Sequence, residues 1–465
     1  MAVIGLDIGT TSAKAVAYRA DGTTAGAGRA PTPWTTTPLG VEMDAHELLD
    51  SARTALATAA DQAGEPIAAV GIASMAESGV LVDAAGRPVA PVIAWHDARD
   101  AIEVQELREV IGAAEFAARA GKPLRGQWSI TKHRWLRRHH PPVATAHRRF
   151  NVAEWVLRGL GGPEVTELSL ACRTGWFDVR ARAWWSAGLA FSGADESLLP
   201  PLVEAGTPLG TVSGAGRDND QFGTALTGAI LTLAGHDHQA AALGVGAARD
   251  GVELDSCGTA EALVRTVAGP LSEEQIQALA AHGITTDVSI RAEHLSLLGG
   301  TEGGLTMQRV LGMLDVDRND LAVLDRAAAA APVNRVQIDG MGSAFLSIRG
   351  VTDGVTSAEV WRAAVQAATD DAARLHRAMD DIVGPVQEVV VTGGWAHSAL
   401  FMDSKRAALG GVRRSEVAEA GTRGAAVLAA RAAGILGPAE HFPADSPADP
   451  SVRAGRSNSS SGGGR

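Results

Sequence analysis

The sequence predicts an α/β protein built from two domains, and three observations support this prediction. The chain has 465 residues, more than a single hydrophobic core usually accommodates. Short apolar segments with strand character alternate with segments of helical periodicity, as in a sheet covered by helices. In each half of the chain, an apolar strand runs into a turn that pairs glycine with hydroxyl residues, at 7–11 and at 255–259.

In the first half, segments 3–8 and 13–18 read as two strands joined by a polar turn. A helix begins at Asp44, which forms a capping-box-like pattern with Glu47, and ends at Gly64. Residues 68–74 follow as a buried strand. The order strand, turn, strand, helix and strand predicts one α/β unit.

The second half repeats this logic. Thr356 and Glu359 form a capping box before a long apolar face that ends at Gly384, and residues 389–392 read as the next strand. Helices are predicted near 399–409 and 424–435. From 438 to 465 the composition is rich in Pro, Ala, Asp, Ser and Gly, so we expect an unfolded tail.

Composition excludes several classes of protein. Hydrophobic residues make up 46% and charged residues 20%, values typical of globular chains. The net charge is −12 and the only basic cluster is the short 137–140 stretch, so we expect no nucleic-acid partner. No apolar segment reaches the roughly 20 residues of a membrane span. Cys172 and Cys257 cannot form a disulfide framework, and with no leader segment we expect a cytoplasmic protein.

Two common nucleotide motifs fail on spacing. A Walker loop needs a second glycine five residues after Gly9, and none is present; the Gly-x-Gly at 244–246 lacks the third glycine of a dinucleotide site. A hairpin turn remains, in which Thr10, Thr11 and backbone N–H groups hold phosphate oxygens. Lys14 would add positive charge, and Asp7 would hold Mg²⁺ through water.

The alternative is that the first turn is an ordinary β-turn, as most isolated Gly-Thr-Thr sequences are. A second matching loop, with Gly258 and Thr259, favours the phosphate interpretation because two such loops could close on a triphosphate. Gly393 and Gly394 follow a strand at a place where backbone can approach a ligand closely.

Asp237 is the candidate catalytic base. It follows the apolar run 230–233, so it lies at the carboxyl end of a predicted strand, where ligand sites of α/β proteins gather. Phosphoryl transfer to an alcohol needs a carboxylate near the attacking hydroxyl. His236 and His238 could instead bind a metal, although no third ligand is near in sequence; we favour a substrate hydroxyl as the partner of His238.

A second polar cluster could bind a sugar. Glu77 and the segment with Trp95, Asp97 and Arg99 combine an aromatic face, carboxylates and a guanidinium. The alternative is a surface ion pair.

These pieces resemble the FGGY carbohydrate kinase family over nearly the whole chain. The landmarks are GLDIGTTSAK at 5–14, AWHDARD at 94–100, TKHRWL at 131–136, TELSLACRTGWFD at 166–178, LAGHDHQAAALGVG at 233–246, VVVTGGWAHS at 389–398 and GTRGAAVLAA at 421–430. The resemblance implies two ribonuclease-H-like domains of the actin, hexokinase and Hsp70 type, with ATP and substrate in the cleft between them. It implies an N-terminal domain over 1–246 and an ATP-binding domain over 247–437.

The resemblance also assigns roles. ATP would be bound by Asp7, Gly9, Thr10, Thr11, Lys14, Gly258, Thr259, Gly393, Gly394 and Ser398, and a small carbohydrate by Glu77, Trp95, Asp97, Arg99 and His238. Asp237 would be the catalytic base, and Mg²⁺ would lie near Asp7 and Asp237. A homodimer is a candidate assembly.

Departures from the family concern the substrate. Glycerol kinases carry an arginine where Ala76 stands and an aromatic residue where Gln127 stands. Xylulokinases carry a histidine in place of Ala76 and an asparagine in place of His238. Neither glycerol nor xylulose is therefore indicated, and the expected substrate is a ketose, polyol or sugar acid. Chaperone-type ATPases and catalytically silent sugar-binding regulators share this fold. An ATPase of that type would not need the sugar cluster, and a silent regulator would not need Asp237, whereas this sequence has both.

Overall fold

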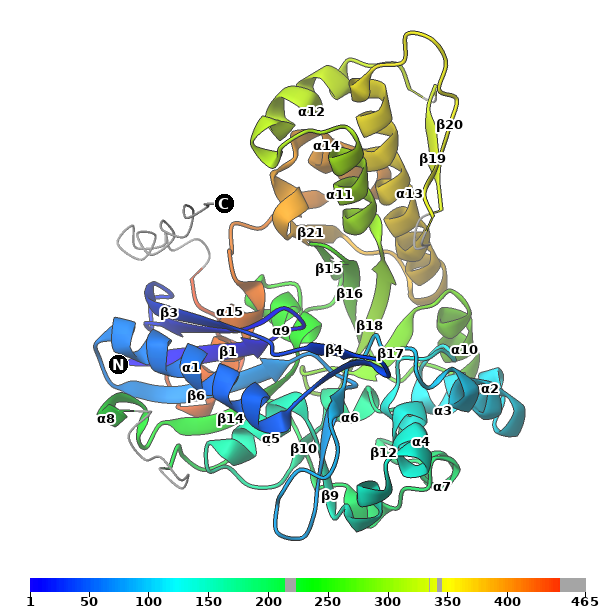
Figure 1. The fold of residues 1–465 in the computed structure, drawn as a ribbon. Helices are drawn as coiled ribbons and strands as arrows, with labels where there is room; N and C mark the ends of the chain where they lie inside the picture. Colours follow the sequence, from blue (N-terminus) through cyan, green and yellow to red (C-terminus); the bar gives the residue numbers. More distant parts are fainter. Residues whose placement is uncertain (214–222, 334, 341–344, 444–465) are drawn as a thin grey trace, which may run out of the picture.

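The computed structural model describes residues 1–213, 223–333, 335–340 and 345–443, which form two lobes, each built on one central sheet (Figure 1). The first lobe contains the sheet of the N-terminal strands. The second lobe contains the sheet formed after residue 251 and lies above the first in this view. In the described part of the chain, no helix is long and apolar enough to cross a membrane.

The first sheet has the strand order β14-β6-β1-β2-β3. Its strands are β1 (Ala2–Ile8), β2 (Ser12–Tyr18), β3 (Thr24–Pro31), β6 (Ile67–Ser74) and β14 (Ile230–His236). β1 is antiparallel to β2 and parallel to β6. Helix α1 (Ala45–Ala63) covers one face and α15 (Ala420–Ala432) the other, which explains why Ile4 and Val3 belong to different cores. A sheet covered on both faces requires nearly continuous apolar strands.

The second sheet repeats the first. Its strands are β17 (Thr285–Val288), β18 (His294–Thr301), β16 (Glu261–Ala268), β15 (Val252–Cys257), β21 (Glu388–Thr392) and β22 (Val412–Arg414), in that order. β15 is antiparallel to β16 and parallel to β21. On the parallel side β22 extends the second sheet as β14 extends the first, and on the antiparallel side β18 corresponds to β3. The predicted two-domain α/β architecture is thus confirmed as a duplicated sheet.

The predicted helix boundaries follow from local capping. Asp44 accepts hydrogen bonds from the backbone N–H groups of His46 and Glu47, and Gly64 ends α1 in the left-handed region at φ 63°. Thr356 and Glu359 form the complete capping box of α13 (Ser357–Val383). The other helices of the second lobe are α10 (Glu273–Ala281), α11 (Gly303–Met313), α12 (Leu321–Ala329) and α14 (Ala399–Leu409). A hairpin of β19 (Gln337–Asp339) and β20 (Ser347–Arg349) also belongs to it.

Apart from α1 and β6, the chain between β3 and β14 forms an accessory region of short elements. Its strands are β4 (Thr35–Thr37), β5 (Gly40–Met43), β7 (Gly79–Val82), β8 (Val92–Ile93), β9 (Arg148–Asn151), β10 (Thr166–Glu167), β11 (Phe177–Asp178), β12 (Ala183–Trp184) and β13 (Leu202–Val203). Its helices are α2 (Ala101–Val110), α3 (Ala113–Ala120), α4 (Ser129–His139), α5 (Val152–Gly159), α6 (Leu168–Cys172), α7 (Ser186–Ser192) and α8 (Gly223–Leu226). A separate core that includes Trp128 and Trp176 holds much of this region together.

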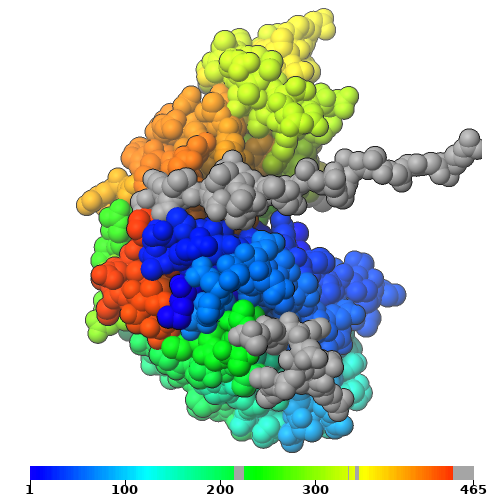
Figure 2. All heavy atoms as spheres, turned by 90° about the vertical axis from the view of Figure 1, so that its left-hand side faces the viewer, coloured from blue at the N-terminus to red at the C-terminus, as the bar shows by residue number. Residues whose placement is uncertain are grey.

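The chain returns to the first lobe at its end. The sequence grouped residues 421–430 with the predicted second domain, 247–437, whereas α15 packs against β1, β6 and β14. Phe442 is buried and stacks on Tyr18 with ring centroids 5.6 Å apart, so the beginning of the predicted tail lies against the first lobe. Figure 2 shows the red C-terminal part of the described chain beside the blue N-terminal part. Residues 444–465 of that tail lie outside the described residues.

Candidate active site

The turn between β1 and β2 is held in one conformation by hydrogen bonds from outside the loop. Thr32 Oγ1 donates to the carbonyl of Gly9 at 2.7 Å, and Trp34 Nε1 donates to that of Thr10 at 2.7 Å. The Gly9 N–H donates to the Ser12 carbonyl at 3.1 Å. The turn is therefore preorganised, and such a turn suits phosphate oxygens.

Asp7 lies beside this turn, near the end of β1. A Cβ atom at Gly421 of α15 would come within 2.3 Å of Asp7 Oδ2, so the glycine makes room for the carboxylate. Asp7 Oδ1 is buried and has no hydrogen-bond partner in the described part of the chain. Burial, and then the negative charge of Asp237, raises the pKa of Asp7. A buried carboxylate short of donors fits a hard cation such as Mg²⁺.

Asp237 is the first residue of α9 (Asp237–Gly244), directly after β14. Its Oδ1 accepts a hydrogen bond from the His238 backbone N–H at 2.7 Å and lies 3.2 Å from His236 Nε2. Burial raises the pKa of Asp237, and the charge of Glu77 raises it further, against a lowering by the His238 N–H and by Arg173. The structure thus brings Asp237 within electrostatic reach of both Asp7 and Glu77.

The two neighbouring histidines are uncharged at neutral pH. Burial lowers the pKa of His238 to about 4 and that of His236 well below its ordinary value. Among the described residues there is no group of three or more His, Cys, Asp or Glu side chains that could hold a metal ion. The histidine metal site left open above therefore has no third ligand there.

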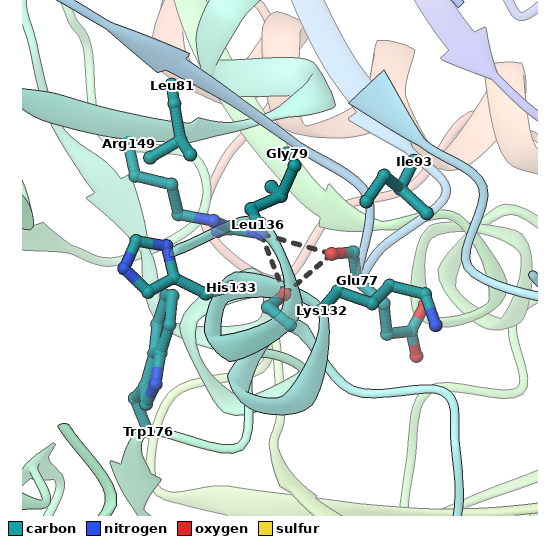
Figure 3. A pocket seen from close by; sticks show the side chains of 10 residues that line it. Glu77, Gly79, Leu81, Ile93, Lys132, His133, Leu136, Arg149 and Trp176 are labelled. Carbon is teal, nitrogen blue, oxygen red and sulfur yellow. Dashed lines mark hydrogen bonds between the residues drawn. The ribbon is translucent and has the colours of Figure 1, made fainter. Parts of the chain in front are cut away.

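Glu77 is held in an unusual backbone conformation. Its φ is 66°, a left-handed value that non-glycine residues rarely adopt, and such residues often lie at functional sites. Its carbonyl accepts hydrogen bonds from Ser129 Oγ at 2.6 Å and Arg149 Nη2 at 3.1 Å. Figure 3 shows Arg149 reaching toward Glu77 above the rings of His133 and Trp176, along a pocket behind Glu77. These contacts hold the Glu77 backbone in this conformation.

The Glu77 carboxylate joins a buried ionic network that the sequence did not reveal. Arg173 Nε donates to Glu77 Oε1 at 2.8 Å, and its Nη1 donates to Asp287 Oδ2 at 3.2 Å. Lys122 Nζ lies 2.5 Å from Asp287 Oδ1. Because Asp287 belongs to β17, the network connects the accessory region to the second sheet. Arg173 lies in the 166–178 landmark, but no spacing rule pairs it with residues 96 and 114 positions away.

The predicted sugar cluster is divided by the structure. Trp95 Nε1 donates to Thr10 Oγ1 at 3.0 Å, which attaches this aromatic side chain to the first loop. Asp97 and Arg99 bind each other at 2.9 Å, and both side chains are almost fully buried. Asp97 also accepts the Val41 N–H at 2.5 Å. These two residues therefore form an internal ion pair, and the surface ion pair considered above is not what is found.

The second loop joins β15 to β16 and contains Gly258 and Thr259. A Cβ atom at Gly304 would come within 1.9 Å of the Gly258 carbonyl oxygen, so α11 lies directly on this loop. Gly393 has a φ of 95° and packs on the backbone of Cys257, where a Cβ atom would lie 2.2 Å from the carbonyl oxygen. Gly394 begins the following 3₁₀ turn. The predicted second-lobe glycines are thus neighbours.

Two predicted ATP-binding residues have other contacts. Lys14 Nζ pairs with Glu419 at the start of α15, at 2.8 Å. Ser398 is buried, caps α14 by accepting the Phe401 N–H, and donates to Asp325 at 2.8 Å. The Ser398 hydroxyl is therefore occupied by structural hydrogen bonds.

Two duplicated α/β lobes define the actin and hexokinase type of fold, and comparison with known proteins identifies the branch. Residues 2–244 match the N-terminal domain of the FGGY family of carbohydrate kinases, and residues 314–433 match its C-terminal domain. The chain belongs to this family and is a carbohydrate kinase that uses ATP.

Individual relatives are similar over nearly the whole chain. A xylulose kinase of Streptomyces rubiginosus is 27% identical over 438 residues, covering 93% of this chain and 88% of the relative. A glycerol kinase of Aromatoleum aromaticum is 30% identical over 471 residues, covering 93% and 90%. The crystal structure of xylulose kinase from Rhodospirillum rubrum superposes with a TM-score of 0.83 at 25% identity, covering 93% and 90%.

Proposed function

We propose that this kinase phosphorylates one hydroxyl of a small sugar, polyol or sugar acid at the site of Asp7, Glu77 and Asp237, with Asp237 as the general base. The observation that carries the proposal is Asp237 itself. It begins a helix at the carboxyl end of a central strand, and burial raises its pKa toward the range in which a carboxylate accepts a proton effectively.

The chemistry follows from this placement. Asp237 accepts the proton of the substrate hydroxyl while that oxygen forms a bond to the γ-phosphorus of ATP and the bond from phosphorus to the β-phosphate oxygen breaks. Asp7 and Asp237 would hold Mg²⁺ through water, and the ion would neutralise charge on the phosphates. The two glycine loops hold the phosphates, and Glu77, Trp95 and His238 contact the sugar.

The substrate differs from those in the relatives' names. Ala76 offers no side-chain donor, and Gln127 Nε2 donates to Glu77 Oε1 at 3.0 Å instead of presenting an aromatic ring. Neither xylulose nor glycerol is therefore the substrate we expect. A cytoplasmic homodimer remains our expectation for location and assembly; Cys172 and Cys257 are both buried free thiols, which suits a reducing compartment.

The test is Asp237→Asn in an assay of substrate-dependent ADP release. We expect kcat to fall by about 100-fold or more, because general-base catalysis contributes about that much, while ATP binding is retained. Asp61→Asn, at an exposed position of α1, is the control and should have no effect. Near-normal turnover in Asp237→Asn would exclude the general-base role, and ADP release independent of substrate would indicate an ATPase.

A further inference from the structure

Arg125 places a guanidinium one side chain away from Glu77, the carboxylate proposed to bind the sugar. It lies in the loop that precedes α4. Its Nε donates to Gln127 Oε1 at 3.0 Å, and its guanidinium lies over the Trp128 ring, 5.6 Å from the centroid. Neither partner is charged. The Nε contact fixes the plane of the guanidinium, and the ring supports it from one side.

Gln127 connects this cation to the proposed substrate site. The Gln127 amide accepts from Arg125 through its oxygen and donates from its nitrogen to Glu77 Oε1 at 3.0 Å. One side chain, Gln127, therefore connects Arg125 to Glu77, which is proposed to orient the substrate. Through the same oxygen Glu77 in turn binds Arg173, whose charge acts on the proposed base Asp237.

The neighbouring charged groups form ion pairs with one another, and none of these pairs includes Arg125. Arg173 and Lys122 together neutralise Glu77 and Asp287. For Arg125, no carboxylate of the described residues lies within ion-pair distance. The side chain is exposed to solvent; the surrounding protein and the positive charge of Arg173 lower its pKa, and the negative charge of Glu77 raises it.

We propose that Arg125 binds a carboxylate of the substrate, so that the substrate is a sugar acid rather than a neutral sugar or polyol; this inference rests on the proposed function. A guanidinium binds a carboxylate through paired N–H donors, and this exposed guanidinium has no carboxylate from the described part of the chain within ion-pair distance. Glu77 does not repel such a substrate, because Arg173 neutralises it at 2.5 Å. Arg125 then sets specificity, and Glu77 orients hydroxyls.

The experiment compares matched substrates. Each aldonate is assayed beside the alditol of the same carbon number and configuration, and beside the corresponding sugar monophosphate, which carries a different anion. We expect the enzyme to prefer an aldonate. Arg125→Gln should raise KM for that aldonate about 10- to 100-fold, the range of a charge-assisted hydrogen bond, and leave KM for ATP unchanged. Arg125→Lys should lie between the two.

Arg108→Gln, at an exposed position of α2, is the matched control and should leave all constants unchanged. If the enzyme prefers alditols and Arg125→Gln does not alter this preference, the inference about Arg125 is overturned, whereas the proposed kinase function stands. Preference for sugar monophosphates would overturn the carboxylate assignment. The remaining case is an enzyme that turns over none of these compounds, and calorimetry with the aldonate addresses it. If the aldonate binds to the unmodified enzyme and Arg125→Gln abolishes this binding, the carboxylate site is supported and the proposed phosphoryl transfer is refuted.

Discussion

Asp7 and Asp255 lie near the ends of corresponding strands of the two lobes. Each lies near the end of the strand that has a parallel neighbour on one side and an antiparallel neighbour on the other, β1 in the first sheet and β15 in the second. Each precedes a turn that contains glycine, at Gly9 and Gly258. The two strands therefore have the same place in their sheets, although Asp7 stands two residues before its glycine and Asp255 three residues before its own.

The surroundings of the two carboxylates differ. Asp7 Oδ1 is buried without a hydrogen-bond partner in the described part of the chain. The Asp255 oxygens also have no hydrogen-bond partner in the described part of the chain, but Asp255 lies 2.7 Å from Lys405 Nζ, and the same ammonium group pairs with Glu261. All three of these side chains are completely buried. Within the described residues, the first lobe thus leaves its carboxylate without a paired cation, whereas the second lobe provides one in Lys405.

The difference in the surroundings of Asp7 and Asp255 suggests different roles for the loops that follow them. A buried, unpaired carboxylate lowers stability, and it persists where it takes part in chemistry. A buried carboxylate with an internal partner contributes to holding the lobe together. We infer that the first loop supports phosphoryl transfer and that the second loop forms a rigid support for the nucleotide.

The largest expected effect is on stability, in Lys405→Met. Removing the ammonium group leaves Asp255 and Glu261 buried without compensation, and breaking a buried pair costs about 3–5 kcal/mol. Thermal or urea unfolding measures the loss. Lys14→Met is the control, because its pair with Glu419 is partly exposed and pairs of this kind contribute about 0–1 kcal/mol. Equal losses in the two variants would contradict the distinction between the lobes.

The next effect is on catalysis, in Asp7→Asn. We expect kcat to fall about 100-fold, or about 2.7 kcal/mol, and the Mg²⁺ requirement to rise, because the amide cannot replace a carboxylate that faces a cation. The unfolding temperature should stay the same or rise, since a buried charge is removed. Asp255→Asn should show the reverse, with lower stability and a smaller change in kcat. A stability loss in Asp7→Asn like that of Asp255→Asn would show that both carboxylates are structural.

Local signals predicted much of the fold. The strands beside the first loop, the Asp44 cap of α1 and the Thr356 capping box depend on neighbours in sequence, and all are found. Asp237 could be placed after its strand for the same reason. Ser398 stands directly before the predicted helix 399–409, so its capping role was visible in the sequence even though the ATP assignment took precedence.

Long-range pairing could not be predicted in this way. Arg173 meets Glu77 and Asp287 only because the accessory region folds back on the second sheet, across 96 and 114 residues. Asp97 and Arg99 have the composition of a sugar site, and only the burial of both side chains shows that they neutralise each other. The return of α15 to the first sheet is likewise a property of the tertiary fold, because helical periodicity does not specify which sheet a helix covers.

The smallest expected effect is a shift in pH dependence, in Glu77→Gln. Asp237 must be ionised to accept a proton, so kcat/KM should fall as the pH falls through its pKa. Glu77 raises that pKa by its negative charge. Without this charge the ionised form of Asp237 is favoured, and the acid limb of the pH profile should move to lower pH, by up to about one unit or 1.4 kcal/mol.

The second lobe supplies the control for this measurement. Glu261 is a buried glutamate that pairs with Lys405 beside the other loop, so Glu261→Gln changes a comparable charge away from Asp237. The acid limb of the pH profile of Glu261→Gln should lie at the same pH as in the unmodified enzyme, even if this variant is less stable. If Glu77→Gln left the acid limb in place, the group that titrates would not be a carboxylate under the influence of Glu77. If both variants moved it equally, the effect would belong to the net charge of the protein, and the contrast between the two lobes would not extend to catalysis.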